Sequence, residues 1–304
     1  MEAKFPSDFS KIKNILLALF GFFIIIGLLS LFCFLKISTS FFNQNKALYT
    51  KTTIVNKWGK LPVKINEESL KFPLAVPNPP RQLSVPILMY HSVGRIPPES
   101  SNLAKELTVD PHSFEEQMKH LKETGYQTIS MKDLFKALYF NYPLPPKPVI
   151  LTFDDGYDNA FYYVLPILNK YHFKGTFFLI TNLVDQPGRL SWLQIQRMSK
   201  AGMEFGSHTQ SHADLKNLPE EQINKELRES KLIIERRLGE RVYFFCYPAG
   251  SYKPEIFPLL KNQGYLLALT TNSGTIENSD HPYELPRIRI SGGMPLEEFK
   301  KLLP

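Results

Sequence analysis

Hydrophobic residues are distributed along this chain in two different patterns, and the patterns separate an N-terminal region from a larger C-terminal one. The first pattern is an uncharged, almost wholly apolar run of 21 residues over 15–35. At a helical rise of about 1.5 Å per residue, a run of this length crosses a bilayer core of about 30 Å. We therefore expect a single transmembrane helix over 15–35, preceded by a short cytoplasmic tail over 1–14.

Two other interpretations of this run are less favoured. A cleaved signal peptide has a shorter apolar region and ends at a small-residue cleavage site, whereas this run ends in Phe34-Leu35-Lys36. A buried core helix is rarely so long or so close to a terminus. Lysines on the two sides of the run nearly balance, so its orientation depends on the chemistry of the rest of the chain.

Residues 36–80 are mixed and polar, and they end in a proline-rich stretch over 72–80. Such a composition is typical of an extended, semi-rigid spacer, so we expect a stalk here. The apolar residues within it, such as Trp58, leave open the alternative that this segment packs onto the following domain.

The second pattern begins near residue 81, where short apolar runs alternate with amphipathic segments up to residue 304. Strands are predicted at 85–90, 126–129, 149–153, 175–180, 203–206, 242–247, 266–270 and 288–290. Helices are predicted at 111–122, 132–139, 159–171, 192–201, 220–238, 255–262 and 296–303. About seven strand–helix units favour a parallel α/β sheet or a (β/α) barrel, so we predict a catalytic domain over 81–304.

Polar residues follow several of these strands at the point where each strand ends. They are Tyr90-His91, Asp154-Asp155, Ser207-His208 and Tyr247-Pro248. Because the carboxyl ends of the strands of a parallel barrel share one rim, residues more than a hundred positions apart are expected to converge there.

The residues at this rim include a set suited to a metal ion. His208 and His212 lie four positions apart and can direct two imidazoles at one ion, while Asp155 adds a hard oxygen ligand. Zinc is the first expectation, and cobalt, nickel, manganese and iron also suit these ligands. A metal makes water more acidic and polarises a carbonyl, and the adjacent Asp154 can then accept the proton. Alone, the Asp-Asp-Gly sequence is more often a turn, and a lone His-x-x-x-His is more often structural.

Net charge and cysteine content exclude some other classes of protein. The formal charge of +7 comes almost wholly from residues 1–80, which hold ten basic against four acidic residues. The rest of the chain is nearly neutral, so a nucleic-acid groove is not expected. The two cysteines, Cys33 and Cys246, form no disulfide framework.

The segments Thr152-Phe153-Asp154-Asp155-Gly156 and Ser207-His208-Thr209-Gln210-Ser211-His212 resemble the first two motifs of the polysaccharide deacetylase family, carbohydrate esterase family 4. The resemblance covers roughly residues 85–290. It implies a distorted (β/α)7 barrel that hydrolyses the acetamide of N-acetylglucosamine-type sugars and releases acetate. It also implies that Asp154 is the general base and that Asp155, His208 and His212 hold the metal.

Two departures from the family pattern concern the remaining catalytic groups. Cys246 stands where the third motif usually has an arginine, so we expect the orienting guanidinium to come from elsewhere, with Arg287 as the preferred donor. The C-terminal histidine that usually acts as general acid is also missing. His91, after the first predicted strand, resembles the acid of the circularly permuted poly-N-acetylglucosamine deacetylase branch, and we expect it to protonate the leaving amine. A hydrogen-bonded loop histidine is the alternative.

Three aromatic residues are weaker candidates for substrate contact. The backbone N–H of Tyr247 is a candidate donor to the oxyanion, and Tyr157 and Trp192 are candidate platforms for a sugar ring. A core position is the more common role for a tryptophan such as Trp192.

These expectations combine into one functional hypothesis. We predict a single-pass membrane protein whose extracytoplasmic domain deacetylates an N-acetylated glycan polymer of the envelope or the exterior. A related amidase that acts on a small cyclic amide is one alternative, and a catalytically silent glycan-binding domain is another. The four residues Asp154, Asp155, His208 and His212 argue against the silent domain, because binding alone needs no base beside a metal.

Overall fold

The centre of this protein is a parallel β-sheet, seen in a computed structural model that describes residues 77–304. The predicted transmembrane helix and most of the predicted stalk lie outside these described residues. No helix within 77–304 is both long and apolar enough to cross a membrane.

The strands of the described region are short. They are β1 (Gln82–Ser84), β2 (Ile87–Tyr90), β3 (Ser92–Val93), β4 (Thr108–Val109), β5 (Gln127–Thr128), β6 (Pro148–Phe153), β7 (Thr176–Leu179), β8 (Glu204–Ser207), β9 (Phe244–Cys246), β10 (Leu267–Leu269), β11 (Ile276–Asn278) and β12 (Ile288–Arg289). The main sheet has the order β10-β9-β8-β7-β6-β2-β12, and every pairing within it is parallel. The predicted parallel α/β sheet is therefore confirmed.

The two edges of this sheet are linked by one segment of the chain. Leu285 forms a parallel bridge with Leu269 of β10, and Ile288 of β12 pairs with Leu88 of β2 only three residues later. The sheet is thus a half-barrel whose edge strands approach each other through residues 285–290. Two small pairs lie outside it, β1 with β11 and β3 with β4.

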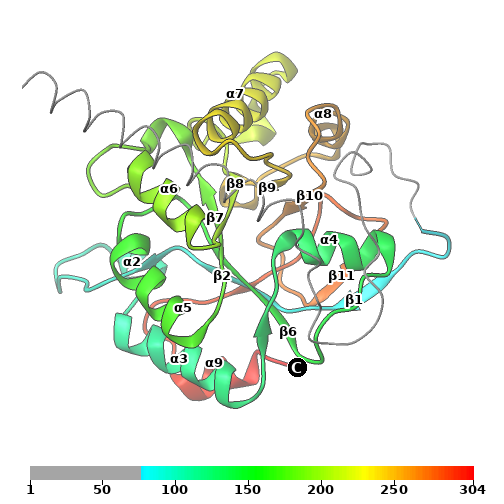
Figure 1. Cartoon of the computed structure of the whole chain (residues 1–304). Coiled ribbons are helices and arrows are strands. Elements are labelled where there is room, and N and C mark those ends of the chain that lie inside the picture. The colour runs from blue at the N-terminus through cyan, green and yellow to red at the C-terminus, as the bar shows by residue number, and fades with distance from the viewer. Residues whose placement is uncertain (1–76) are drawn as a thin grey trace, which may run out of the picture. The chain divides into compact units, whose positions relative to one another are not determined.

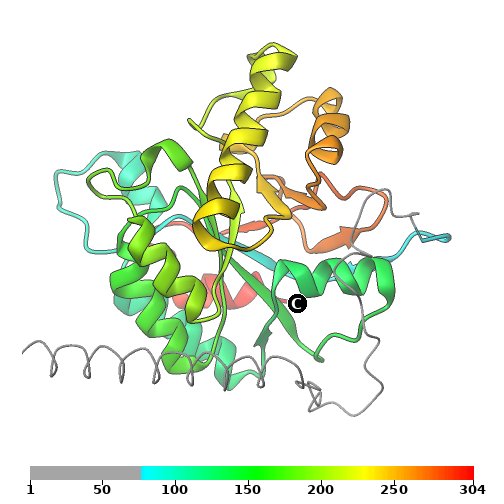
Figure 2. The same ribbon diagram turned by 45° about the horizontal axis from the view of Figure 1, so that its top comes forward.

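Helices surround the strands (Figure 1). They are α2 (Asn102–Leu107), α3 (Pro111–Glu123), α4 (Met131–Phe140), α5 (Leu165–Tyr171), α6 (Trp192–Lys200), α7 (Glu220–Leu238), α8 (Phe257–Asn262) and α9 (Leu296–Lys301). Figure 2 shows α3, α5 and α6 gathered on one side, with the long α7 rising at the top. These helices cover the outer face of the sheet and leave the strand ends open to loops.

Local sequence explains where several helices begin. Asp110 caps α3 by accepting a hydrogen bond from the N–H of His112, and Pro111 needs no partner at the first helical position. Ser130 and Ser191 each form a capping box, with Asp133 and Gln194 respectively.

The predicted helix over 159–171 is divided in the structure. A π-helical turn over Ala160–Val164 precedes α5, which begins at Leu165. Pro166 has no N–H to donate, so a regular α-helical ladder cannot run through this point. Turns of this kind are frequent near functional sites, and this one begins five residues after Asp155.

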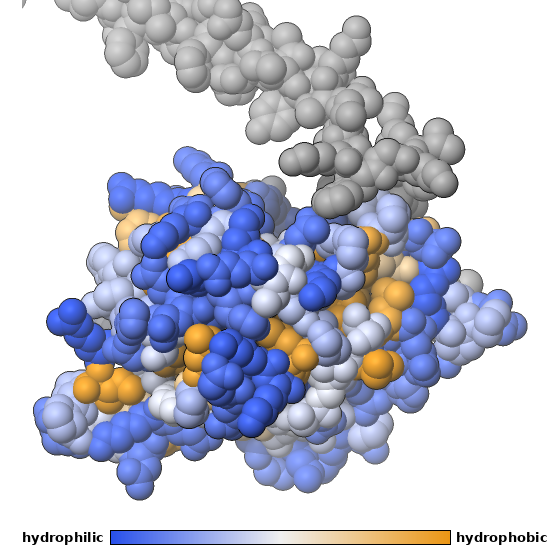
Figure 3. Space-filling view, turned by 90° about the horizontal axis from the view of Figure 1, so that it is seen from below, coloured by the Kyte–Doolittle hydropathy of each residue, from blue (hydrophilic) through white to orange (hydrophobic). Residues whose placement is uncertain are grey.

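The core lies between the sheet and the helices, and its centre is aromatic. Phe153 of β6 stacks between Tyr90 of β2 and Phe177 of β7, with ring centroids 5.4 and 4.7 Å apart. Phe114 of α3 meets Phe153 edge-on at 5.9 Å. The molecular face in Figure 3 is mainly hydrophilic, with small, separate hydrophobic patches, as expected where the large apolar groups are internal.

Candidate active site

The direction of the side chains along β6 places the candidate site. Phe153 faces the helix layer, because it contacts Phe114 of α3. Consecutive residues of a strand point to opposite faces, so Thr152 and Asp154 face the inside of the half-barrel. Arg287 reaches both of them there, with Nη1 at 3.1 Å from Thr152 Oγ1 and 2.9 Å from Asp154 Oδ1.

Asp155, His208 and His212 come together at the carboxyl ends of β6 and β8. Asp155 Oδ1 lies 3.4 Å from His208 Nε2 and 3.5 Å from His212 Nε2. Their ligand atoms all lie within 4.8 Å of one another. The structure therefore brings together the three residues that the sequence proposes as metal ligands.

The spacing and chemistry of these three groups fit a divalent cation. Zinc–ligand bonds of about 2.0–2.1 Å at tetrahedral angles place ligand atoms about 3.4 Å apart, which matches the two measured distances. His208 Nδ1 lies 2.7 Å from the carbonyl oxygen of Cys246 and donates its proton there, so Nε2 is the nitrogen that faces Asp155. His212, whose side chain is 39% exposed, lies on the solvent side of the group, where a substrate can approach.

The backbone at this site takes conformations that residues other than glycine rarely adopt. Asp155 has φ 72°, Thr209 has φ 66° and His212 has φ 62°. Such strain persists only where surrounding contacts hold it, and it clusters at functional sites. Arg189 supplies one such contact, because its Nη1 donates a hydrogen bond of 2.7 Å to the carbonyl oxygen of Asp155.

Asp154 forms a bidentate ion pair with Arg287 in the interior. The two guanidinium nitrogens lie 2.9 and 2.8 Å from the two carboxylate oxygens, and both side chains are buried. Burial alone would raise the pKa of the Asp154 carboxyl, but the charge of Arg287 and its hydrogen bonds outweigh it and hold that pKa well below its usual range. Asp154 is therefore ionised at neutral pH, as a proton acceptor must be.

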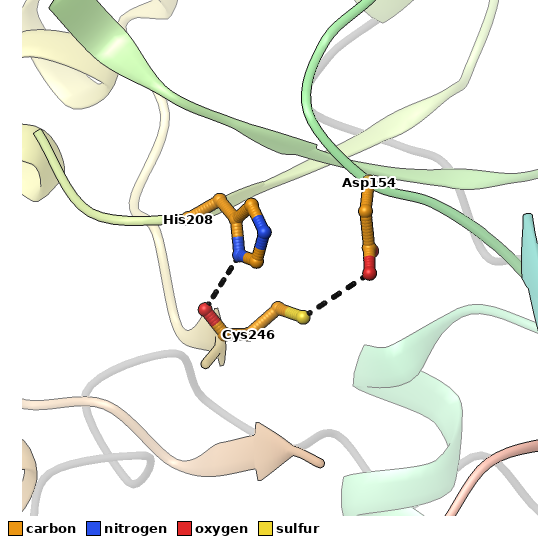
Figure 4. A group of neighbouring side chains, drawn as sticks. All are labelled: Asp154, His208 and Cys246. Carbon is orange, nitrogen blue, oxygen red and sulfur yellow. Dashed lines mark hydrogen bonds between the residues drawn. The ribbon is translucent and has the colours of Figure 1, made fainter. Parts of the chain in front are cut away.

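Cys246 lies between Asp154 and His208 (Figure 4). Its carbonyl faces His208, and its thiol lies 3.5 Å from Asp154 Oδ2 and 3.1 Å from Arg287 Nη2. Burial raises the pKa of this thiol, so it is neutral. Asp154, His208 and Cys246 are close enough to form a second metal-binding group, but the neutral thiol and the guanidinium of Arg287 disfavour a cation there.

His91 directly follows β2, the strand that neighbours β6. Burial lowers the pKa of His91. The negative charges of Asp154 and Asp155 raise this pKa, and the positive charges of Arg287 and Arg289 lower it. Tyr90 of β2 is in register with Phe153 of β6, so His91 lies alongside Asp154 at the carboxyl ends of these neighbouring strands. The structure thus places it beside the group that the sequence proposes.

The structure places the three aromatic candidates in different environments. Tyr157 lies beside the metal ligands, with the guanidinium of Arg189 stacked 4.1 Å from its ring centroid. Trp192 is only 9% exposed and belongs to the hydrophobic core, so its proposed role as a sugar platform is not supported. The N–H of Tyr247 donates to the carbonyl of Leu269 at 3.2 Å. That bond belongs to the sheet and leaves no free N–H for an oxyanion.

Two contacts at this site were not predicted from the sequence. Cys246 orients His208 through its main-chain carbonyl, which no side-chain pattern reveals. Arg189 lies three residues before α6, and no sequence pattern connects it to Asp155. The contact depends on the packing of the loop over 185–190 against the loop over 155–158. The bond from Leu190 N–H to the Gly156 carbonyl, at 2.9 Å, joins these two loops.

Comparison with known proteins agrees with this geometry. Residues 141–268 match the family model described as polysaccharide deacetylase. The Bacillus subtilis protein YxkH, whose name assigns it to the same family, is 33% identical over 210 residues, which cover 69% of this chain and 72% of YxkH. The poly-β-1,6-N-acetyl-D-glucosamine N-deacetylase of Escherichia coli is 25% identical over 64% of this chain, but the match spans only 35% of that enzyme.

A solved structure shares the fold as well. The Streptococcus pyogenes deacetylase PplD, described in complex with acetate, superimposes with a TM-score of 0.68 at 31% identity, covering 74% of this chain and 99% of PplD. The similarity to YxkH extends over more than two thirds of both chains. This chain therefore belongs to the polysaccharide deacetylase family, carbohydrate esterase family 4.

Proposed function

We propose that this protein removes the N-acetyl group from N-acetylglucosamine units of an envelope or extracellular polysaccharide, in a reaction that requires a divalent metal. The observation that carries the proposal is the convergence of Asp155, His208 and His212 next to the buried pair of Asp154 and Arg287. Three ligands that leave positions open, with an ionised base beside them, form the arrangement that hydrolysis of an amide needs.

Asp155, His208 and His212 would hold the metal. When bound there, a divalent cation would supply polarisation of the acetamide carbonyl and a lower pKa for bound water. Zinc is the first choice, and cobalt, nickel, manganese and iron suit the same ligands.

Asp154 accepts the proton of the attacking water. Arg287 occupies both of its oxygens with one hydrogen bond each, but a carboxylate offers about four lone-pair positions, so sites for a third donor remain. Arg287 also donates to the carbonyl of Thr270 at 2.8 Å, which fixes the guanidinium against the sheet. Arg287 thus orients the base and keeps it ionised.

His91 donates a proton to the nitrogen that leaves. When the C–N bond breaks, the acetyl group departs as acetate with the oxygen of water, and the sugar nitrogen needs one proton to leave as a neutral amine. Because burial lowers the pKa of His91, its protonated form gives up a proton more readily than an ordinary imidazolium does.

The names of two related proteins support the removal of acetyl groups, one of them from a glycan. The relative from Escherichia coli is named for poly-β-1,6-N-acetyl-D-glucosamine, and the Streptococcus pyogenes deacetylase is described with acetate. Tyr157, at the edge of the metal site, is the remaining aromatic candidate for contact with a sugar ring. A small cyclic amide stays the second candidate, because the same chemistry opens other C–N bonds.

The location and the finer fold are part of the proposal. We infer a distorted (β/α)7 barrel, supported by the strand order and by the segment 285–290 that bonds to both edges. The apolar run over 15–35 supports a single-pass anchor with the domain outside, where a polymer substrate is accessible.

Acetate release tests the proposal. The full chain, with zinc added, is incubated with oligomers of β-1,6-linked N-acetylglucosamine, with chitooligosaccharide, with peptidoglycan fragments and with a small cyclic amide. We expect release of acetate from at least one glycan and none from the Asp154→Asn variant. A silent binding domain would release none from any substrate, and an amidase would act on the cyclic amide alone.

A further inference from the structure

The loop that carries the two histidine ligands is unusual in its backbone. Residues 209–211 separate His208, at the end of β8, from His212. Both Thr209 and His212 have positive φ angles, in a region that side chains with a Cβ rarely occupy. The loop therefore needs contacts from outside to keep this conformation.

Glu226 of α7 supplies those contacts. Its Oε2 accepts hydrogen bonds from the N–H groups of Gln210 and Ser211, at 2.8 and 2.9 Å. Its Oε1 accepts a third from Ser211 Oγ at 2.7 Å. Hydrogen bonds to an ionised acceptor are about twice as strong as neutral ones, so this one carboxylate binds the middle of the loop firmly.

The two histidines depend on this loop to different extents. His208 is 3% exposed at its side chain and is held directly through Nδ1 by the Cys246 carbonyl. The ring of His212 is far more exposed; it lies 3.5 Å from Asp155 and edge-on to the His208 ring, with centroids 4.9 Å apart. Its backbone N–H donates to Thr209 Oγ1, so its position follows that of the loop.

We propose that Glu226 is a positioning residue for the metal site, which it serves by holding the 209–211 loop so that His212 completes the ligand set. This inference rests on the metal site of the proposed function. Groups that orient metal ligands from behind typically account for 10–100-fold in metal affinity, and we expect Glu226 to lie in this range.

The test measures zinc affinity of the full chain by competition with a chromophoric chelator. Glu226→Ala removes all three hydrogen bonds, and we expect its Kd for Zn²⁺ to rise 10–100-fold. Glu226→Gln keeps an oxygen that can accept both N–H groups and an amide that can donate to Ser211 Oγ, so most of the affinity returns. Ser211→Ala loses one bond and gives a smaller increase than Glu226→Ala.

Glu229→Ala is the matched control. Glu229 lies one turn along the same helix and bonds only to the neighbouring Arg228 in the structure. Its removal should leave the Kd unchanged. The increase in Tm on adding Zn²⁺ provides a second readout. If Glu226 had a merely structural role, Glu226→Ala would lower Tm equally with and without zinc. If Glu226 positions the metal site, the zinc-dependent increase in Tm is smaller in Glu226→Ala than in the wild type.

Two results would overturn the inference in different ways. If the wild-type chain and Glu226→Ala bind Zn²⁺ with the same Kd, Glu226 has no positioning role, although the proposed function stands. If the same competition shows that the wild-type chain binds neither Zn²⁺ nor another divalent ion, the proposed metal site is refuted. The positioning role of Glu226 is then refuted as well.

Discussion

Replacement of Arg287 by methionine is the single substitution that removes most interactions from this site. Methionine keeps much of the apolar length of the side chain but removes the charge and all five hydrogen-bonding contacts of the guanidinium. These contacts join it to Thr152, Asp154 (twice), Cys246 and Thr270. Asp154 would then be a buried carboxylate with only the Cys246 thiol beside it, at 3.5 Å.

The expected loss follows from the burial of both partners. Removal of one member of a buried ion pair costs about 3–5 kcal/mol, because the other charge is left uncompensated. In the wild type the pKa of Asp154 is lowered by Arg287, so the pair contributes stability above the unfolded pKa and loses it only in strong acid. In the variant, burial, the largest influence on Asp154, raises the pKa of its carboxyl against the lowering charges of His208 and His91, so stability now falls as pH increases. The difference between the two proteins should therefore be larger at pH 7.5 than at pH 4.5.

Urea unfolding followed by circular dichroism measures this difference at both pH values. Arg228→Met is the control, because Arg228 is 58% exposed at its side chain and pairs only with Glu229 in the structure; a change within about 0.5 kcal/mol is expected there. A loss below about 1 kcal/mol for Arg287→Met, or an equal loss at the two pH values, would refute the reasoning.

Two further predictions concern other groups. Glu277 of β11 is buried with neither oxygen bonded in the structure, and burial raises its pKa to about 9. The wild type should therefore lose stability as pH rises from the unfolded pKa towards 9, by about 1.4 kcal/mol per pH unit. Urea unfolding at pH 5–8 measures this slope, and Glu277→Gln should remove it. Parallel curves of unfolding free energy against pH for the two proteins would contradict the prediction. His91→Ala should lower turnover by about 10²–10⁴-fold while zinc content by elemental analysis stays at the wild-type level, and a fully active variant would show that another group is the acid.

The main strands and helices were predictable because they are marked by local pattern. The apolar run at 149–153 became β6, and the amphipathic segments over 111–122 and 192–201 became α3 and α6. The pair β1 and β11 was not predicted, because Gln82–Ser84 and Ile276–Asn278 contain no apolar run and their paired residues are 192–196 positions apart in the chain. Such a ribbon is specified by tertiary contact and not by local preference.

The ligand residues were predictable for a different reason, namely that strand ends converge on one rim. The finer contacts depend on how helices and loops dock. Trp192 is buried because α6 packs against α7, where Arg237 lies 5.4 Å above its ring. Cys246 Sγ lies 3.1 Å from Arg287 Nη2. A small residue at position 246 thus leaves room for the guanidinium of Arg287, which directly precedes β12. Sequence spacing alone contains neither fact.

Acetate release from β-1,6-linked N-acetylglucosamine oligomers tests the central claim most directly. The full chain is compared after chelation, after reloading with zinc, and as the Asp154→Asn variant with zinc bound. We predict release only by the zinc-loaded wild type, with the variant lower by at least about 10²-fold, the minimum expected for loss of a general base. Equal release by the variant, or release that chelation does not change while it strips the metal, would contradict the account.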